Sequence, residues 1–201
     1  MRVVTFTLLG ILMFNLAIKF INKFDNEVIS VKKYEVVLIS ILIAISTTLI
    51  SFKYYDIEFL YYFYLSIYLI LVAYVDKKTM YIYTLFPYMT FAVGIMYFFH
   101  KNTCVNYNEV IYVIIYIAII GIFSRSNSFN TGDRDIFISI TFFLCSSDTL
   151  LTLLINLVLS EILFGLINIK EIVKNKGKLN NPKPFAPYIA ITSMIVILIL
   201  K

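Results

Sequence analysis

Eight apolar stretches divide this chain of 201 residues and restrict it to one class of fold. Several approach the roughly 20 residues that cross the hydrocarbon core of a bilayer. A water-soluble core of this size could not bury them, and they do not alternate polar and apolar residues as the strands of a membrane barrel do. We therefore expect an all-α, polytopic integral membrane helix bundle with about eight transmembrane helices. Its helices are predicted at residues 3–21, 36–52, 59–75, 82–99, 110–124, 130–147, 149–169 and 185–200.

The charged residues lie in short gaps between these stretches, so residues 1–201 are expected to form a single transmembrane domain with no soluble domain. The net charge of +5 forms no basic stripe on a folded surface, which argues against nucleic acid as a partner. With eight helices, 13 of the 17 Lys and Arg residues fall on one side of the membrane. Cytoplasmic loops of membrane proteins carry an excess of Lys and Arg, so this side is predicted to be cytoplasmic. The protein is expected to lie in the plasma membrane.

Two aspartates on the expected cytoplasmic side are the strongest candidates for chemistry. Asp76 ends the third stretch in YLILVAYVDKKTMYIY, and Asp133 begins the sixth in NTGDRDIF. Two carboxyls that share a low-dielectric site cannot both ionise easily. One protonated and one ionised partner can activate water for peptide hydrolysis. The competing interpretation for each is a helix cap, and Asp135 serves as an internal control that is expected to be non-catalytic.

Three further residues have specific expectations attached to them. Gly132 is expected to allow close approach of backbones and unusual dihedrals next to Asp133. Glu161 lies inside the seventh stretch, where a carboxylate suggests function, although a hydrogen bond to Ser160, Asn156 or a neighbouring helix would also explain it. Pro87 is expected to kink the fourth helix.

The sequence argues against several other site types and interfaces. Cys104 and Cys145 lie far apart with no CxxC, so a zinc site is not expected, and two inert thiols are favoured over a disulfide between them. The only histidine, His100, is expected to be solvated at an outer helix end. The tyrosine-rich run IEFLYYFYLSIYL is expected to form an aromatic belt at the outer interface.

Three segments together resemble the type IV prepilin peptidase family, which includes archaeal preflagellin peptidases. YLILVAYVDKKTMYIY resembles the family helix that ends in an Asp, TGDRDIF resembles its GxGD motif, and PFAPYIA resembles its last helix entry. The resemblance covers about residues 59–196, so residues 59–201 would be the catalytic core, and 1–58 two N-terminal helices that resemble the family only weakly. Tyr83 replaces a family Pro, and Asn130 replaces the first Gly of GxGD.

The resemblance implies an aspartic-type endopeptidase that needs no cofactor or metal. Asp76 and Asp133 would be catalytic, with Gly132 and Asp135 in the surrounding motif and Pro184, Phe185 and Pro187 as structural residues. Substrates would be pilin-like or pseudopilin precursors, cut after a short basic leader at the cytoplasmic membrane face. Because NKFDNEVISVKK contains no cysteines, the chain resembles the shorter form that has the peptidase activity alone.

Two alternatives stay open at this level. The chain could be a non-enzymatic transporter or export-machinery subunit whose working polar groups are Glu161 and Asn156. It could also be an inactive relative of the peptidase, because two motif positions differ.

Overall fold

The structure, a computed structural model, describes residues 2–24, 29–101, 107–125, 130–145, 148–174 and 182–199. These residues form helices connected by short segments and contain no β-strand, which confirms the all-α prediction for this part of the chain. The helices are α1 (Arg2–Phe24), α2 (Lys33–Lys53), α3 (Asp56–Thr79), α4 (Leu85–Lys101), α5 (Tyr107–Arg125), α6 (Thr131–Ile140), the 3-10 helix η1 (Thr141–Leu144), α7 (Thr149–Lys174) and α8 (Ala186–Ile199).

Each of the eight predicted stretches contains one α-helix, but the helices differ in length. Five of them, α1, α2, α3, α5 and α7, are long and apolar enough to cross a membrane. The other three are shorter, with 17 residues in α4, 10 in α6 and 14 in α8. At about 1.5 Å per residue, even α4 falls short of a core of about 30 Å. The prediction of a helical membrane protein is therefore supported by five helices rather than by eight.

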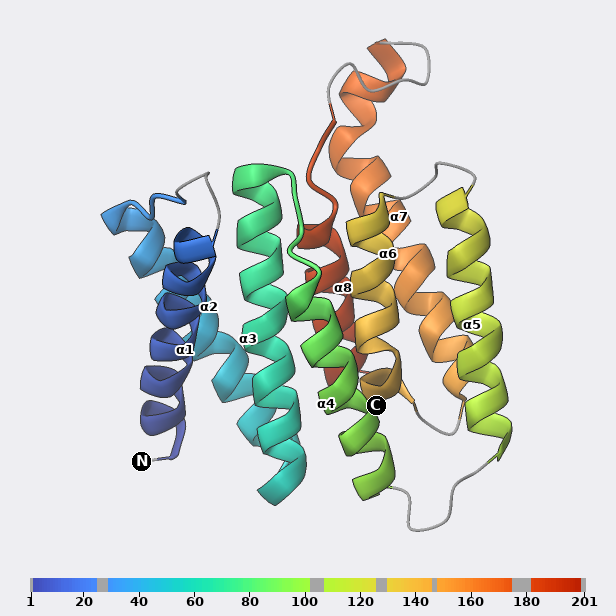
Figure 1. Cartoon of the computed structure of the whole chain (residues 1–201), viewed down its shortest axis with the longest axis horizontal. Helices are drawn as coiled ribbons and strands as arrows, with labels where there is room; N and C mark the ends of the chain where they lie inside the picture. The colour runs from blue at the N-terminus through green and yellow to red at the C-terminus, as the bar shows by residue number, and fades with distance from the viewer. Residues whose placement is uncertain are drawn as a thin grey trace.

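Successive helices run in opposite directions through the bundle (Figure 1). α3 is the most buried of the long helices, and it packs against α1, α2, α4 and α8. α8 also packs against α7 and α6, so its first turn lies among the helices that carry the candidate residues. The end of α3 and the beginnings of α6 and α8 lie at the same end of the bundle (Figure 1).

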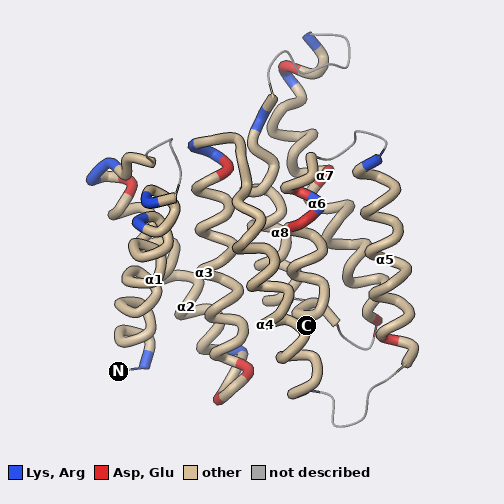
Figure 2. The backbone as a smooth tube through the Cα atoms, in the orientation of Figure 1, with Lys and Arg blue, Asp and Glu red and all other residues tan. Residues whose placement is uncertain are grey.

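Lys and Arg residues gather at this same end (Figure 2). The side chains of Arg2 and Lys53 belong to the opposite end, where α1 begins and α2 ends. Figure 2 also shows acidic residues near the end of α3 and near the start of α6. The charge asymmetry counted from the sequence is therefore present in the folded bundle.

Two local predictions were wrong. Pro87 lies in the first turn of α4, which begins at Leu85, and not in the helix interior. A proline is tolerated in a first turn because its missing N–H has no intrahelical acceptor there, so a kink is not required. The tyrosine-rich run does not face an interface along its whole length, because Tyr62 and Tyr68 are almost fully buried in the core. The Tyr62 hydroxyl hydrogen-bonds the Tyr97 hydroxyl at 2.8 Å.

The chain leaves α3 through a tight turn at Met80. This residue has the left-handed φ of 56°, and its N–H donates to the carbonyl oxygen of Asp76 at 2.8 Å. Such a cap ends a helix sharply, although glycine usually fills it. The turn directs residues 80–84 back across the bundle toward the start of α6.

Candidate aspartate site

Asp76 is buried against the N-terminus of α8. The residue is 5% exposed, and its Oδ2 accepts a hydrogen bond from the backbone N–H of Ala186 at 3.0 Å. The backbone N–H of Phe185 also donates to this carboxyl group. Free N–H groups at a helix N-terminus form a favourable site for an anion. The carboxylate of Asp76 is therefore held by a segment 110 residues away in the sequence.

Asp133 occupies the first turn of α6 and is 6% exposed. Its carboxylate accepts a hydrogen bond from the backbone of Asn130, the residue that precedes the helix. This bond satisfies a donor at the helix start, as a capping residue does. Asp133 is thus held locally, whereas Asp76 is held by a distant helix.

A buried bond between α3 and α6 fixes the relative height of the two aspartates. The hydroxyls of Tyr68 and Ser139 lie 2.9 Å apart. Asp76 follows Tyr68 by eight residues and Asp133 precedes Ser139 by six, and the two helices run in opposite directions. At about 1.5 Å per residue, both aspartates lie on the same side of this bond, at depths that differ by about 3 Å.

Gly132 brings the start of α6 against the segment that follows α3. A Cβ atom added to Gly132 would lie 2.9 Å from Cβ of Ile82, closer than side chains normally approach. The predicted close approach is therefore present, although its partner is a side chain rather than backbone. The predicted unusual dihedrals are not, because Gly132 lies within α6.

The two carboxyl groups are within electrostatic reach of each other. Burial, followed by the negative charge of Asp76, raises the pKa of Asp133 to about 7. The charge of Glu161 adds to this effect, and the hydrogen bond from Asn130 opposes it. α6 is too short to be one of the five long apolar helices, and Asp133 lies in its first turn at the charged end of the bundle. Asp133 therefore keeps its proton to a much higher pH than an exposed aspartate.

This raised pKa predicts that Asp133→Asn stabilises the fold in a pH-dependent way. Above the ordinary value of 3.8 the unfolded chain releases the proton, whereas folded Asp133 holds it until about pH 7. Ionisation of Asp133 in the unfolded chain alone therefore lowers the stability of the fold as pH rises through this window. Relative to the unmodified chain, Asp133→Asn should gain on the order of 4 kcal/mol between pH 4 and pH 8. Unfolding in detergent at both pH values measures this, and an equal difference at both would contradict it.

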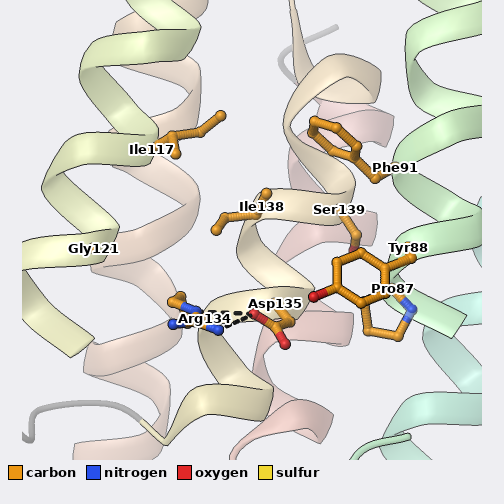
Figure 3. A pocket seen from close by; sticks show the side chains of 9 residues that line it. All are labelled: Pro87, Tyr88, Phe91, Ile117, Gly121, Arg134, Asp135, Ile138 and Ser139. Atoms are coloured by element: carbon orange, nitrogen blue, oxygen red, sulfur yellow. Dashed lines mark hydrogen bonds and ion pairs between the residues drawn. The ribbon is translucent and has the colours of Figure 1, made fainter. Parts of the chain in front are cut away.

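Asp135 faces another part of the molecule. Its Oδ1 accepts hydrogen bonds from Nε of Arg134 at 2.9 Å and pairs with Nη2 at 2.8 Å. Both side chains line a cavity with residues of α4 and α5 (Figure 3). The surroundings of Asp135 differ from those of Asp133, whose carboxylate accepts a hydrogen bond from the backbone of Asn130. The structure thus separates Asp135 from the two buried aspartates.

Three cations close to the site in sequence are paired with acids, whereas Lys77, the residue after Asp76, is exposed and forms no ion pair with another described residue. Lys78, two residues after Asp76, forms an ion pair with Glu35 at 2.6 Å. Arg134, beside Asp133, is paired with Asp135, and Lys183, just before α8, is paired with Glu171. These pairs reduce the positive charge around the two aspartates.

The three residues of the last motif surround the start of α8. Phe185 is buried, and its ring packs against those of Phe137, Phe164 and Tyr188. Pro187 is the second residue of α8, where a proline fits, and Pro184 lies in the segment just before the helix. Their packing positions the N–H groups that bind Asp76.

Glu161 does not make the predicted hydrogen bonds. Its side chain is exposed on α7, and it makes no hydrogen bond to another described residue. Ser160 instead bonds the Asn156 carbonyl and the Thr192 hydroxyl, and Asn156 is fully buried beside Ser193. Glu161 and Asn156 therefore lie on different faces of α7, which weakens a shared polar path through the membrane.

The predicted inert thiols and the alternative disulfide involve Cys104, which lies outside the described residues; Cys145 is buried, and its Sγ lies 3.5 Å from the carbonyl oxygen of Thr141. In the described ranges, no group of three or more His, Cys, Asp or Glu side chains could hold a metal ion. His100 is exposed at the end of α4. Comparison of the chain with protein-family models, curated proteins and solved structures found no match.

Proposed function

We propose that this chain is a membrane-embedded aspartyl endopeptidase in which Asp76 and Asp133 act on one water molecule. The observation that supports it best is the burial of two carboxyls from distant segments at one end of the bundle, within electrostatic reach. Such a pair has the properties of a shared-proton site. Its protons belong to the pair, so activity should follow the titration of both groups together.

The surroundings of the two aspartates suggest different roles. Two backbone N–H groups bind Asp76, and these hydrogen bonds to the carboxylate oppose the effect of its burial. Asp133, with its pKa near 7, is the proton donor. Asp76 takes a proton from water, and the hydroxide attacks the scissile carbonyl carbon. Asp133 gives its proton to the carbonyl oxygen, which forms a gem-diol. Asp76 then gives the proton taken from water to the nitrogen as the C–N bond breaks, and a gem-diol hydroxyl returns a proton to Asp133, which leaves a carboxylic acid and restores the pair.

Helix capping alone accounts for only part of this arrangement. Asp76 caps α8 and Asp133 caps α6, so each has a structural partner. Capping does not require two carboxyls to be buried close together, because an asparagine would make the same bonds without the cost of a buried charge. That cost supports a role in which the negative charge itself is used.

The substrate class follows from the resemblance to the type IV prepilin peptidases. The proposed substrates are pilin-like precursors whose short basic leader lies in the cytoplasm and whose apolar helix lies in the bilayer. The end of the bundle with the most Lys and Arg is assigned to the cytoplasm of a plasma-membrane protein. We include α4, α6 and α8 among the membrane-embedded helices, which extends the five long helices to eight, with the first turn of α6 and Asp133 outside the hydrocarbon core.

Cleavage of a precursor tests the proposal. The chain is co-expressed with a precursor whose basic leader ends in Gly before an apolar helix, and mass spectrometry measures the precursor N-terminus. Loss of the leader with the unmodified chain, and not with Asp76→Asn, is the expected result. A full-length precursor with the unmodified chain, tested over several such leaders, would favour the inactive-relative alternative.

The α8 contact provides a test of how Asp76 is oriented. Ala186→Pro removes the N–H that donates to Asp76, at a first helical position where proline is well tolerated. We expect cleavage to fall about tenfold, the effect of one charge-assisted hydrogen bond. Ala186→Ser keeps the N–H and is the matched control. Equal rates for the two variants, with both folded, would argue against this contact.

A further inference from the structure

A cavity of about 390 Å³ lies between α4, α5 and α6, on the side of α6 that carries Asp135. Its volume is within the range of about 300–1,000 Å³ of ligand sites. α6 forms its floor and packs against both α4 and α5 (Figure 1). No atom lies within 4 Å of a Cβ built on Gly121 of α5, so the space beside this glycine is open. α5 is one of the five helices that could cross a membrane, which places the cavity beside the bilayer.

The cavity is charged at one end and apolar at the other. Arg134 and Asp135 lie together at one end, whereas Ile117 and Phe91 lie at the other (Figure 3). The charged end is the start of α6, at the end of the bundle where Lys and Arg gather (Figure 2). A lipid in the leaflet on that side has the same order, with its headgroup at that end and its chains toward the bilayer centre. The polarity of the cavity therefore fits an amphiphile in that orientation.

The two charged side chains have bonding capacity to spare. A guanidinium carries five N–H donors, and Arg134 directs Nε and Nη2 to a single oxygen, Oδ1 of Asp135. Oδ2 of Asp135 accepts no hydrogen bond from another described residue. The Arg134 side chain is 35% exposed, so its remaining donors are accessible. The remaining donors of Arg134 can bind an anionic group, and Oδ2 of Asp135 can accept from a cationic N–H donor beside it. The two side chains together therefore match a headgroup that carries both groups.

We propose that this cavity binds one zwitterionic glycerophospholipid with a primary ammonium headgroup, such as phosphatidylethanolamine. The lipid phosphate accepts from Arg134, the ammonium donates to Oδ2 of Asp135, and an acyl chain lies along Ile138, Phe91 and Ile117. This site is separate from the Asp76 and Asp133 pair. It depends on the membrane location of the chain and is independent of the proposed peptidase activity.

Retention of lipids by the full chain tests which headgroup the cavity prefers. The protein is reconstituted in vesicles with equal parts of phosphatidylethanolamine, phosphatidylcholine and phosphatidylglycerol that share the same acyl chains. It is then extracted in mild detergent, and native mass spectrometry identifies the bound lipid. We expect phosphatidylethanolamine to be retained about tenfold over phosphatidylcholine, whose quaternary ammonium has no N–H to donate. Equal retention of the three lipids, or a preference for phosphatidylglycerol, overturns the proposal.

Two glycines provide a matched pair for the cavity itself. Gly121→Phe places a ring in the open space, whereas Gly165→Phe adds the same ring on α7, where a Cβ also meets no atom within 4 Å. Gly165 does not line the cavity. Retention should fall about tenfold in Gly121→Phe and stay unchanged in Gly165→Phe. Equal retention in both overturns the site, and the smaller Gly121→Leu, checked by circular dichroism, replaces Gly121→Phe if that variant does not fold.

Asp135→Asn separates headgroup recognition from occupancy. The neutral side chain keeps an oxygen acceptor but loses the charge that binds the ammonium. We expect the variant to retain a lipid while losing its preference for phosphatidylethanolamine over phosphatidylcholine. An unchanged preference would assign recognition to another group and overturn the role of Asp135.

Discussion

Replacement of Asp76 or Asp133 by asparagine is expected to lower the rate of precursor cleavage by about 10⁴-fold, the upper range for a general acid or base. Asparagine has the same shape and can still accept the backbone bonds that hold each carboxylate, from Ala186 to Asp76 and from Asn130 to Asp133. The change therefore removes the proton chemistry and leaves the caps in place. Because the aspartates act as a unit, the double variant should be no slower than either single variant.

Two matched replacements make this result specific. Asp148 is exposed and directly precedes α7, which begins at the other end of the bundle. Asp148→Asn should therefore leave cleavage unchanged. Asp135→Asn, beside the pair in sequence but turned toward Arg134, should reduce cleavage far less than Asp133→Asn. Rates are measured with the same precursor and with protein amounts matched in the membrane. Normal processing by Asp76→Asn, with the variant folded, would end the peptidase proposal.

The sequence could predict the features that depend on composition and order along the chain. Apolar stretches give the positions of the helices, because the length of an apolar run reflects the thickness of the bilayer. The distribution of Lys and Arg predicts that Asp76 and Asp133 share one end of the bundle, and the end of α3 and the start of α6, which carry them, do lie at one end (Figure 1). That each carboxyl is buried could also be expected, since both adjoin apolar helices.

Contacts between distant segments could not be predicted in this way. No pattern in the sequence indicates that the N–H of Ala186 binds Asp76, or that Tyr68 bonds Ser139. Tyr62 shows why composition misleads here, because tyrosine is typical of membrane interfaces, yet this hydroxyl finds Tyr97 in the core. Glu161 is the reverse case, because the sequence suggests a hydrogen-bonded side chain and the structure exposes it. Such outcomes depend on which faces of the helices pack together, and the pattern of apolar and polar residues along the chain does not reveal that packing.

Gly132→Ala is expected to lower cleavage by about 100-fold while leaving the chain folded. The added methyl group would lie 2.9 Å from Cβ and 3.0 Å from Cδ1 of Ile82, so the start of α6 and the segment after α3 must separate. Asp133 is the next residue and moves with this turn, whereas Asp76 stays bound to α8. A displacement of about 1 Å between catalytic groups can cost about 100-fold in rate. Cleavage measured beside the unfolding temperature separates this effect from loss of folded protein.

Removal of the opposing side chain should reverse the defect. Ile82→Gly deletes the three atoms nearest to the new methyl group, so Gly132→Ala combined with Ile82→Gly should cleave faster than Gly132→Ala alone. Ile82→Gly by itself is the control, because a glycine there also loosens residues 80–84. A double variant faster than Gly132→Ala would show that the spacing between the two segments sets the rate, as a shared water requires. If the two single losses simply add, Gly132 affects something other than the distance from Asp133 to Asp76, and the close contact with Ile82 has no part in positioning the pair.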